Sequence, residues 1–121
     1  MALFSEIIIG VVAAIHVHLL WVEMFAWTTR GMKFLTGLPG ETFEPSRIPA
    51  KNVGLFNGFP AAGLIASIMI GDPLWSKNIA LGFLGFISIA GIFGAATADR
   101  KLLLVQTVPA LAGIAALFLN G

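Results

Sequence analysis

Four long apolar segments limit what this chain can fold into. They cover about residues 4–29, 52–70, 77–98 and 102–119. Each is close to the roughly 20 residues that an α-helix needs to cross a bilayer. Lipid offers the backbone no hydrogen-bond partners, so a spanning segment of this kind has to be helical. We therefore predict an all-α fold, an antiparallel four-helix transmembrane bundle.

The composition points to the same environment. Hydrophobic residues make up 58% of the 121 residues, and only 11% are charged. A soluble domain of this length buries too small a fraction of its surface to hide so much apolar area. There is room for one domain, so residues 1–121 are expected to form a single membrane domain in contact with the lipid bilayer. The net charge of +1 gives no reason to expect a nucleic-acid partner.

The connections and their charges predict the topology. Short connections at 71–76 and 98–101 make consecutive helices antiparallel neighbours, whereas the long connection at 30–51 is expected to be a loop that can contain a short interfacial turn. Six of the seven cations fall on one side of the predicted bundle, and only Lys77 falls on the other. The six are Arg30, Lys33, Arg47, Lys51, Arg100 and Lys101. Short cytoplasmic loops carry such an excess. We expect a multi-pass protein of the inner (cytoplasmic) membrane with both termini on the non-cytoplasmic side.

The stretch "HVHLLWVEM" (16–24) places ionisable groups inside the first apolar segment. His16 and Glu23 are seven residues apart and share one helix face, whereas His18 points to nearly the opposite side. The two histidines therefore cannot chelate one metal from a regular helix, and with no cysteine in the chain we predict no metal site. No catalytic residues can be assigned, and an enzymatic activity is not expected.

Polar side chains in the other segments are the natural partners of this face. We predict a buried polar cluster of His16, Glu23, Asn57 and Gln106, because an ionisable residue within a span normally faces the bundle interior. Two alternatives remain open. Glu23 can instead pair with Arg100 or Lys101 from a neighbouring loop. Asn57 and Gln106 also each precede a proline by three residues. Their side-chain amides can donate a hydrogen bond to the backbone carbonyl that a helix proline leaves without a donor.

His18 is expected to face lipid, another helix or a partner subunit. Ala14 lies one turn before it, and a histidine that follows a small residue by one turn is suited to axial ligation of a tetrapyrrole. A pigment on His18 is thus an alternative to contact with a partner. No other cofactor is predicted.

Several stretches resemble one known family. They are "GVVAAIHVHLLWVEMFAW" (10–27), "NVGLFNGFPAAGL" (52–64), "AGIFGAATADRK" (90–101) and "VQTVPAL" (105–111). In order and spacing they are similar to the domain of unknown function 1304 family, small bacterial membrane proteins with four predicted helices. The resemblance covers nearly the whole chain and implies a fold without a reaction. Matching positions include His16, Glu23, Asn57 and Gln106.

A carboxylate, an amide and three phenol groups of the family pattern are missing from this chain. The family has glutamate at position 15, glutamine at 53, and tyrosine at 18, 56 and 93, and this chain has Ile15, Val53, His18, Phe56 and Phe93. The chain thus resembles a divergent member. This loss favours a structural or accessory subunit that packs against a larger membrane complex. The alternative is a membrane enzyme or transporter that handles a proton or a small molecule through the polar cluster.

Overall fold

The computed structural model describes all residues from 1 to 121 and contains helices without strands. The long helices are α1 (Leu3–Phe25), α3 (Arg47–Met69), α4 (Pro73–Thr97) and α5 (Val108–Asn120), the last preceded by a π-helical segment, η3 (Leu103–Thr107). α1, α3, α4, and η3 together with α5 are each long and apolar enough to cross a membrane. The all-α helical bundle is confirmed.

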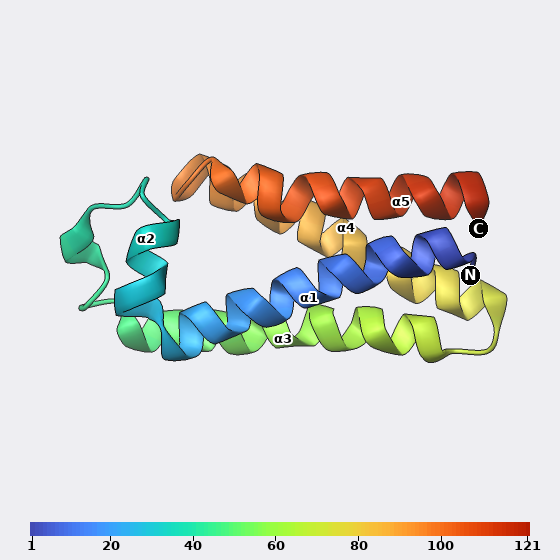
Figure 1. Cartoon of the computed structure of the whole chain (residues 1–121), viewed down its shortest axis with the longest axis horizontal. Helices are drawn as coiled ribbons and strands as arrows, with labels where there is room; N and C mark the ends of the chain where they lie inside the picture. Colours follow the sequence, from blue (N-terminus) through green and yellow to red (C-terminus); the bar gives the residue numbers. More distant parts are fainter.

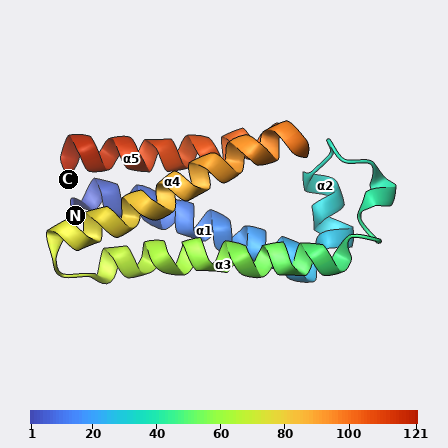
Figure 2. The same ribbon diagram turned by 180° about the vertical axis from the view of Figure 1, so that it is seen from behind.

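The four helices run alternately up and down the bundle. α1 packs against α3 and α5, and α4 packs against the same two neighbours. Figures 1 and 2 show that α1 and α4 are inclined to the other two helices. Both termini and the turn between α3 and α4 lie at one end of the bundle. At the other end α1 lies beside α3 and α4 beside η3, and the two pairs diverge.

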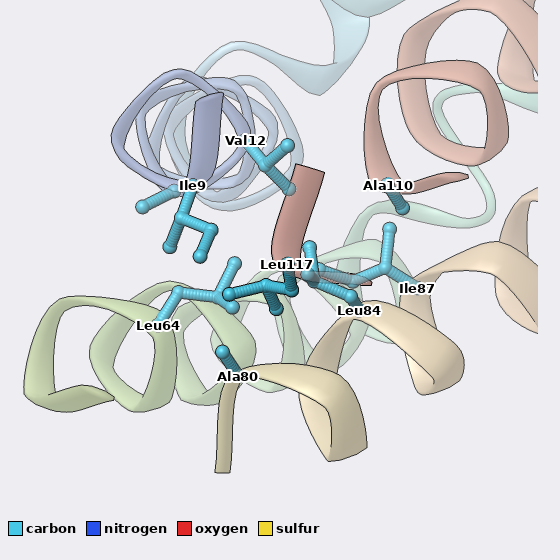
Figure 3. Close-up of a cluster of buried hydrophobic side chains, with 9 residues drawn as sticks. Ile9, Val12, Leu64, Ala80, Leu84, Ile87, Ala110 and Leu117 are labelled. Atoms are coloured by element: carbon cyan, nitrogen blue, oxygen red, sulfur yellow. The ribbon is translucent and has the colours of Figure 1, made fainter. Parts of the chain in front are cut away.

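A tight apolar core fills the half of the bundle near the termini. All four long helices contribute to it, and Figure 3 shows Leu64, Leu84, Ile87 and Leu117 packed together. The full set is Ile9, Val12, Ala13, Leu64, Ala80, Leu84, Ile87, Ala110 and Leu117, each at most 2% exposed. The outward faces carry many large exposed apolar side chains, among them Phe25, Met69 and Phe86. A soluble monomer rarely exposes so much contiguous apolar surface, so the outer face suits lipid.

The diverging end is covered by the segment between α1 and α3. It contains a π-helical turn, η1 (Trp27–Gly31), a short helix, α2 (Met32–Phe34), and a 3-10 turn, η2 (Gly40–Thr42). We call residues 27–46 the cap. Figure 1 shows α2 between the diverging helix pairs.

Side-chain contacts between its two ends hold the cap together. The indole Nε1 of Trp27 donates to Ser46 Oγ at 2.9 Å, and the Trp27 ring packs on Phe43 with ring centres 4.9 Å apart. Phe43 is only 1% exposed. The cap is therefore an ordered layer and not a free loop.

The predicted helix boundaries need correction. α4 begins at Pro73 and not at 77, because the Asp72 side chain accepts a hydrogen bond from the Trp75 N–H at 3.0 Å and Pro73 has no N–H to leave unpaired. α3 begins at Arg47 and not at 52, since Pro49 in a first turn loses no helical hydrogen bond. The expected loop at 30–51 is wrong only at its end, because residues 47–51 belong to α3, and the rest of it contains the short segments α2 and η2.

Candidate functional site

Glu23 of α1 and Asn57 of α3 form the first polar pair. The Asn57 side-chain amide Nδ2 donates a hydrogen bond to Glu23 Oε1. The helices can approach because of glycines on α3. A Cβ at Gly54 would lie 2.7 Å from Met24 Cγ, which is closer than real side chains come. The close packing of α1 on α3 thus sets this pair in place.

His16 of α1 and Gln106 of η3 form the second pair. His16 is 1% exposed, and its Nδ1 lies 2.8 Å from the Val12 carbonyl oxygen. A carbonyl can only accept, so Nδ1 carries the hydrogen and the other ring nitrogen is an acceptor. Gln106 Nε2 lies 3.3 Å from His16 Nε2 and donates to it. Both ring nitrogens therefore have protein partners, which leaves neither for a metal.

Three of the four predicted cluster residues line one cavity of about 270 Å³ under the cap. Glu23, Asn57 and Gln106 are its polar groups, and His16 lies behind Gln106. The rest of the wall is mainly apolar and comes from every part of the diverging end. Its residues are Leu19, Val22, Trp27, Phe34, Leu35, Val53, Phe56, Phe86, Ala90, Gly94 and Leu102.

Glu23 also lines a second, much smaller cleft of about 30 Å³ that includes Arg47, Lys51 and Thr28. Arg47 pairs with Glu44 at 3.1 Å, and Glu23 makes no ion pair. Glu23 therefore lies between the apolar cavity and a polar cleft among exposed cations.

The two alternative roles considered for these residues are contradicted. Glu23 does not pair with Arg100 or Lys101, because the ion pairs of the chain are Arg47 with Glu44 and Lys101 with Asp99. The Lys101 ammonium also donates to the Phe34 carbonyl and Thr36 Oγ1, both at 2.7 Å. The side-chain amides of Asn57 and Gln106 do not hydrogen-bond to the backbone near the prolines either. Asn57 and Gln106 donate instead across helix interfaces, to side chains of α1.

Two further interhelical bonds were not predicted. Ser76 Oγ of α4 donates to the Ser67 carbonyl of α3 at 2.7 Å, and Thr107 Oγ1 of η3 donates to the Ser88 carbonyl of α4 at 3.0 Å. With the Asn57–Glu23 and Gln106–His16 bonds, each of the four adjacent helix pairs has one polar side-chain link. Serine and threonine give no sequence signal for this role, since their hydroxyls can equally bond their own helix.

Asp99, between α4 and η3, fastens the cap to the far side of the bundle. Its carboxylate accepts from the backbone N–H groups of Lys101 at 2.9 Å and Gly37 at 2.8 Å. These two hydrogen bonds, that of Lys101 first, hold the pKa of Asp99 below its ordinary value, and the charge of Lys101 adds to them. Asp99 and Lys101 thus close the cap over the cavity.

His18 lies on the outer face of α1, exposed, as its helical position predicts. Its ring stacks loosely on Trp21 with centres 5.9 Å apart. Ala14 and His18 border one groove on the outer surface of the bundle. What covers His18, a partner or a pigment, stays a prediction.

Together, fold and site define a four-helix protein whose helices are long and apolar enough to span a membrane, with a capped, mainly apolar cavity that holds three polar side chains. The family described as "Protein of unknown function (DUF1304)" matches residues 10–118, so the chain belongs to this family and the resemblance is confirmed. One relative is the uncharacterized protein YpaA of Lactococcus lactis subsp. lactis (strain IL1403). It is 25% identical over 108 residues, which cover 88% of this chain and 89% of YpaA. No solved structure matches the chain.

Proposed function

We propose that this protein binds a small, largely apolar molecule with a hydrogen-bonding group in the cavity under the cap, and that Glu23 exchanges a proton there. The observation that carries the proposal is the convergence of Glu23, Asn57 and Gln106 on one otherwise apolar cavity. Sites for small molecules are typically apolar with a few convergent polar groups, and 270 Å³ is near the lower end of their size range.

The hydrogen bonds leave groups free for a ligand. Asn57 uses Nδ2 on Glu23 Oε1, so Asn57 Oδ1 and Glu23 Oε2 remain available. Gln106 uses one N–H on His16, so its second N–H and its carbonyl oxygen remain. A ligand with a hydroxyl, amide or carbonyl group finds both donors and acceptors here.

The cavity wall supports entry from the lipid. Val53 and Phe56 of α3 and Phe86 of α4 line the cavity and are also exposed on the bundle surface. A lipophilic molecule dissolved in the bilayer therefore has a lateral route between α3 and α4. This route suits a substrate that is mostly apolar.

The small cleft supports proton exchange on the cap side. Glu23 borders it together with Arg47 and Lys51, so protons can pass between the carboxyl group and water at the cation-rich end. An excess of cations marks the cytoplasmic side of short-looped membrane proteins. We therefore propose that the cap faces the cytoplasm, with both termini on the opposite side of the inner membrane.

Trp27 lines the cavity and reports on binding. In a Trp21→Phe/Trp75→Phe background, 4-bromobenzyl alcohol should quench Trp27 fluorescence with a saturating curve. Ala90→Phe fills the cavity and should abolish saturation, whereas the matched Ala96→Phe on the exposed face of α4 should not. Linear quenching that Ala90→Phe leaves unchanged would mean partition into detergent and would contradict the proposal.

The proton step needs its own comparison. Wild-type binding of the same alcohol should depend on pH, and Glu23→Gln should bind without that dependence, since the amide keeps the shape and loses the titrating group. A pH dependence that survives Glu23→Gln would assign the proton to another residue.

A second candidate function, an accessory subunit of a larger membrane complex, is favoured by the exposed His18 on the outer face of α1. A partner subunit seated there would cover this polar ring on a surface that otherwise suits lipid. Purification from native membranes tests this directly, because other subunits or pigment absorbance should accompany the protein. A colourless protein that purifies alone would contradict it.

A further inference from the structure

Two grooves on the outer surface of the bundle meet along α1. The first, of about 430 Å³, is apolar and runs past Ala14 to Val105 of η3. The second, of about 260 Å³, lies nearer the cap and includes Trp21, Arg30 and Lys33. His18 and Phe34 border both grooves. The two therefore form one continuous surface, apolar towards the bundle centre and cationic at the cap, which we call the outer groove.

The cations of the outer groove have no partner within the protein. The ion pairs of the chain are Arg47 with Glu44 and Lys101 with Asp99, and neither involves Arg30 or Lys33. No acidic residue lines either part of the groove. Two uncompensated positive charges thus lie just beyond the last turn of α1.

We propose that the outer groove binds an anionic phospholipid. Its phosphate lies between Arg30 and Lys33, and one acyl chain follows the apolar part past Ala14. The order of the surface along α1 matches a single lipid molecule, with a cationic end at headgroup depth and an apolar stretch below it. Basic pockets between helices at a membrane surface select anionic headgroups.

The ring residues of the groove fit the same occupant. Trp21 and His18 lie between the cationic and apolar parts, and aromatic rings with a polar edge prefer this interfacial depth. His18 there can hydrogen-bond to the ester region of the lipid. The bound lipid would then be the hydrogen-bond partner of the exposed His18, and no second protein would be needed.

Native mass spectrometry of the detergent-purified protein tests the proposal, with phosphatidylglycerol or phosphatidylcholine of identical acyl chains as probes. One phosphatidylglycerol should remain bound, and phosphatidylcholine should bind at least about tenfold more weakly. Arg30→Gln/Lys33→Gln should lose that preference. The control Lys51→Gln/Arg100→Gln removes the same charge from exposed cations at the same end, and should bind as wild type does.

The chain-binding part is tested separately. Ala14→Phe fills the apolar groove and should weaken phosphatidylglycerol binding, whereas Ala62→Phe on the exposed face of α3 should not. In vesicles, phosphatidylglycerol with brominated chains should quench Trp21 more than brominated phosphatidylcholine does, with Trp21→Phe as the background. Equal binding of the two lipids, or equal losses in the two double-cation variants, would overturn the proposal.

Discussion

Asn57 of α3 donates its side-chain hydrogen bond to the carboxyl group of Glu23 on α1. The partner of this carboxyl group, in the last turn of α1, is thus a neutral amide on the neighbouring helix, although six cations lie at that end of the bundle. The amide holds the carboxyl group at the cavity wall and leaves one of its oxygens free. This relationship links the packing of α1 on α3 to the chemistry proposed for the cavity.

Asn57→Ala should weaken the contact between α1 and α3. Polar bonds between membrane helices contribute about 0.6 kcal/mol on average and up to about 1.7 kcal/mol, because the unfolded chain in the membrane also finds partners. We expect a loss of about 1 kcal/mol in the free energy of unfolding, measured in mixed micelles. A double-mutant cycle with Glu23→Ala, which removes the acceptor, isolates the pair, and additive losses would show that the bond contributes nothing.

Gly91→Ala should destabilise the protein by about 1–3 kcal/mol, as overpacking does. A Cβ at this position would lie 2.2 Å from Thr107 Oγ1 and 2.9 Å from the Thr107 backbone nitrogen, so η3 would have to move. Gly85→Ala on the same helix is the control, because its Cβ would meet nothing within 4 Å. Similar thermal unfolding of the two variants would contradict the close approach of η3 to α4.

The His16 ring should carry a hydrogen on Nδ1, because Val12 offers only an acceptor, and none on Nε2, because Gln106 donates to that nitrogen. Nitrogen NMR of protein labelled at histidine should show an unprotonated Nε2 that accepts from Gln106. Gln106→Leu should change the Nε2 signal and leave Nδ1 nearly unchanged. A hydrogen on Nε2 in the wild type would mean that the Gln106 amide is turned the other way.

Asp99 should make closure of the cap depend on pH. Its pKa is lowered in the folded state, so its stabilising effect is complete above the ordinary carboxyl pKa of about 3.9 and is lost as the pH falls through the lowered value. The Gly37 amide donates to Asp99, so its hydrogen-exchange rate measures how far this contact of the cap is closed. Protection at neutral pH should decline below about pH 4.

Asp99→Ala should remove that protection at every pH, whereas Asp99→Asn keeps an acceptor and should retain part of it without the acid transition. Unchanged exchange in Asp99→Ala would show that other contacts hold the cap.

Much of the fold could be predicted from the sequence, because apolar runs of spanning length have one stable form in lipid. The residues at which the helices begin and end were harder to predict from the sequence. The Asp72-Pro73 pair is a local capping signal that identifies the start of α4, but Pro49 inside the first turn of α3 is ambiguous until the helix is known to begin at Arg47.

The residues of the site could be predicted from the sequence, but their hydrogen-bond partners could not. The seven-residue spacing of His16 and Glu23 places them on one face, but their partners depend on which helices are neighbours. In the bundle, Glu23 is hydrogen-bonded to Asn57 of α3, and His16 is hydrogen-bonded to Gln106 of η3. The anchoring of the cap by Asp99 joins residues 62 positions apart and leaves no local pattern.

One titration shows whether the polar groups of the apolar cavity recognise a ligand. Protein that retains only Trp27 is titrated with 4-bromobenzyl alcohol and, separately, with 4-bromotoluene, which lacks the hydroxyl group. The alcohol should quench Trp27 with a saturating curve and an affinity about tenfold above that of 4-bromotoluene, because its hydroxyl group pairs with Glu23, Asn57 or Gln106. Equal, non-saturating quenching by both compounds would contradict this recognition.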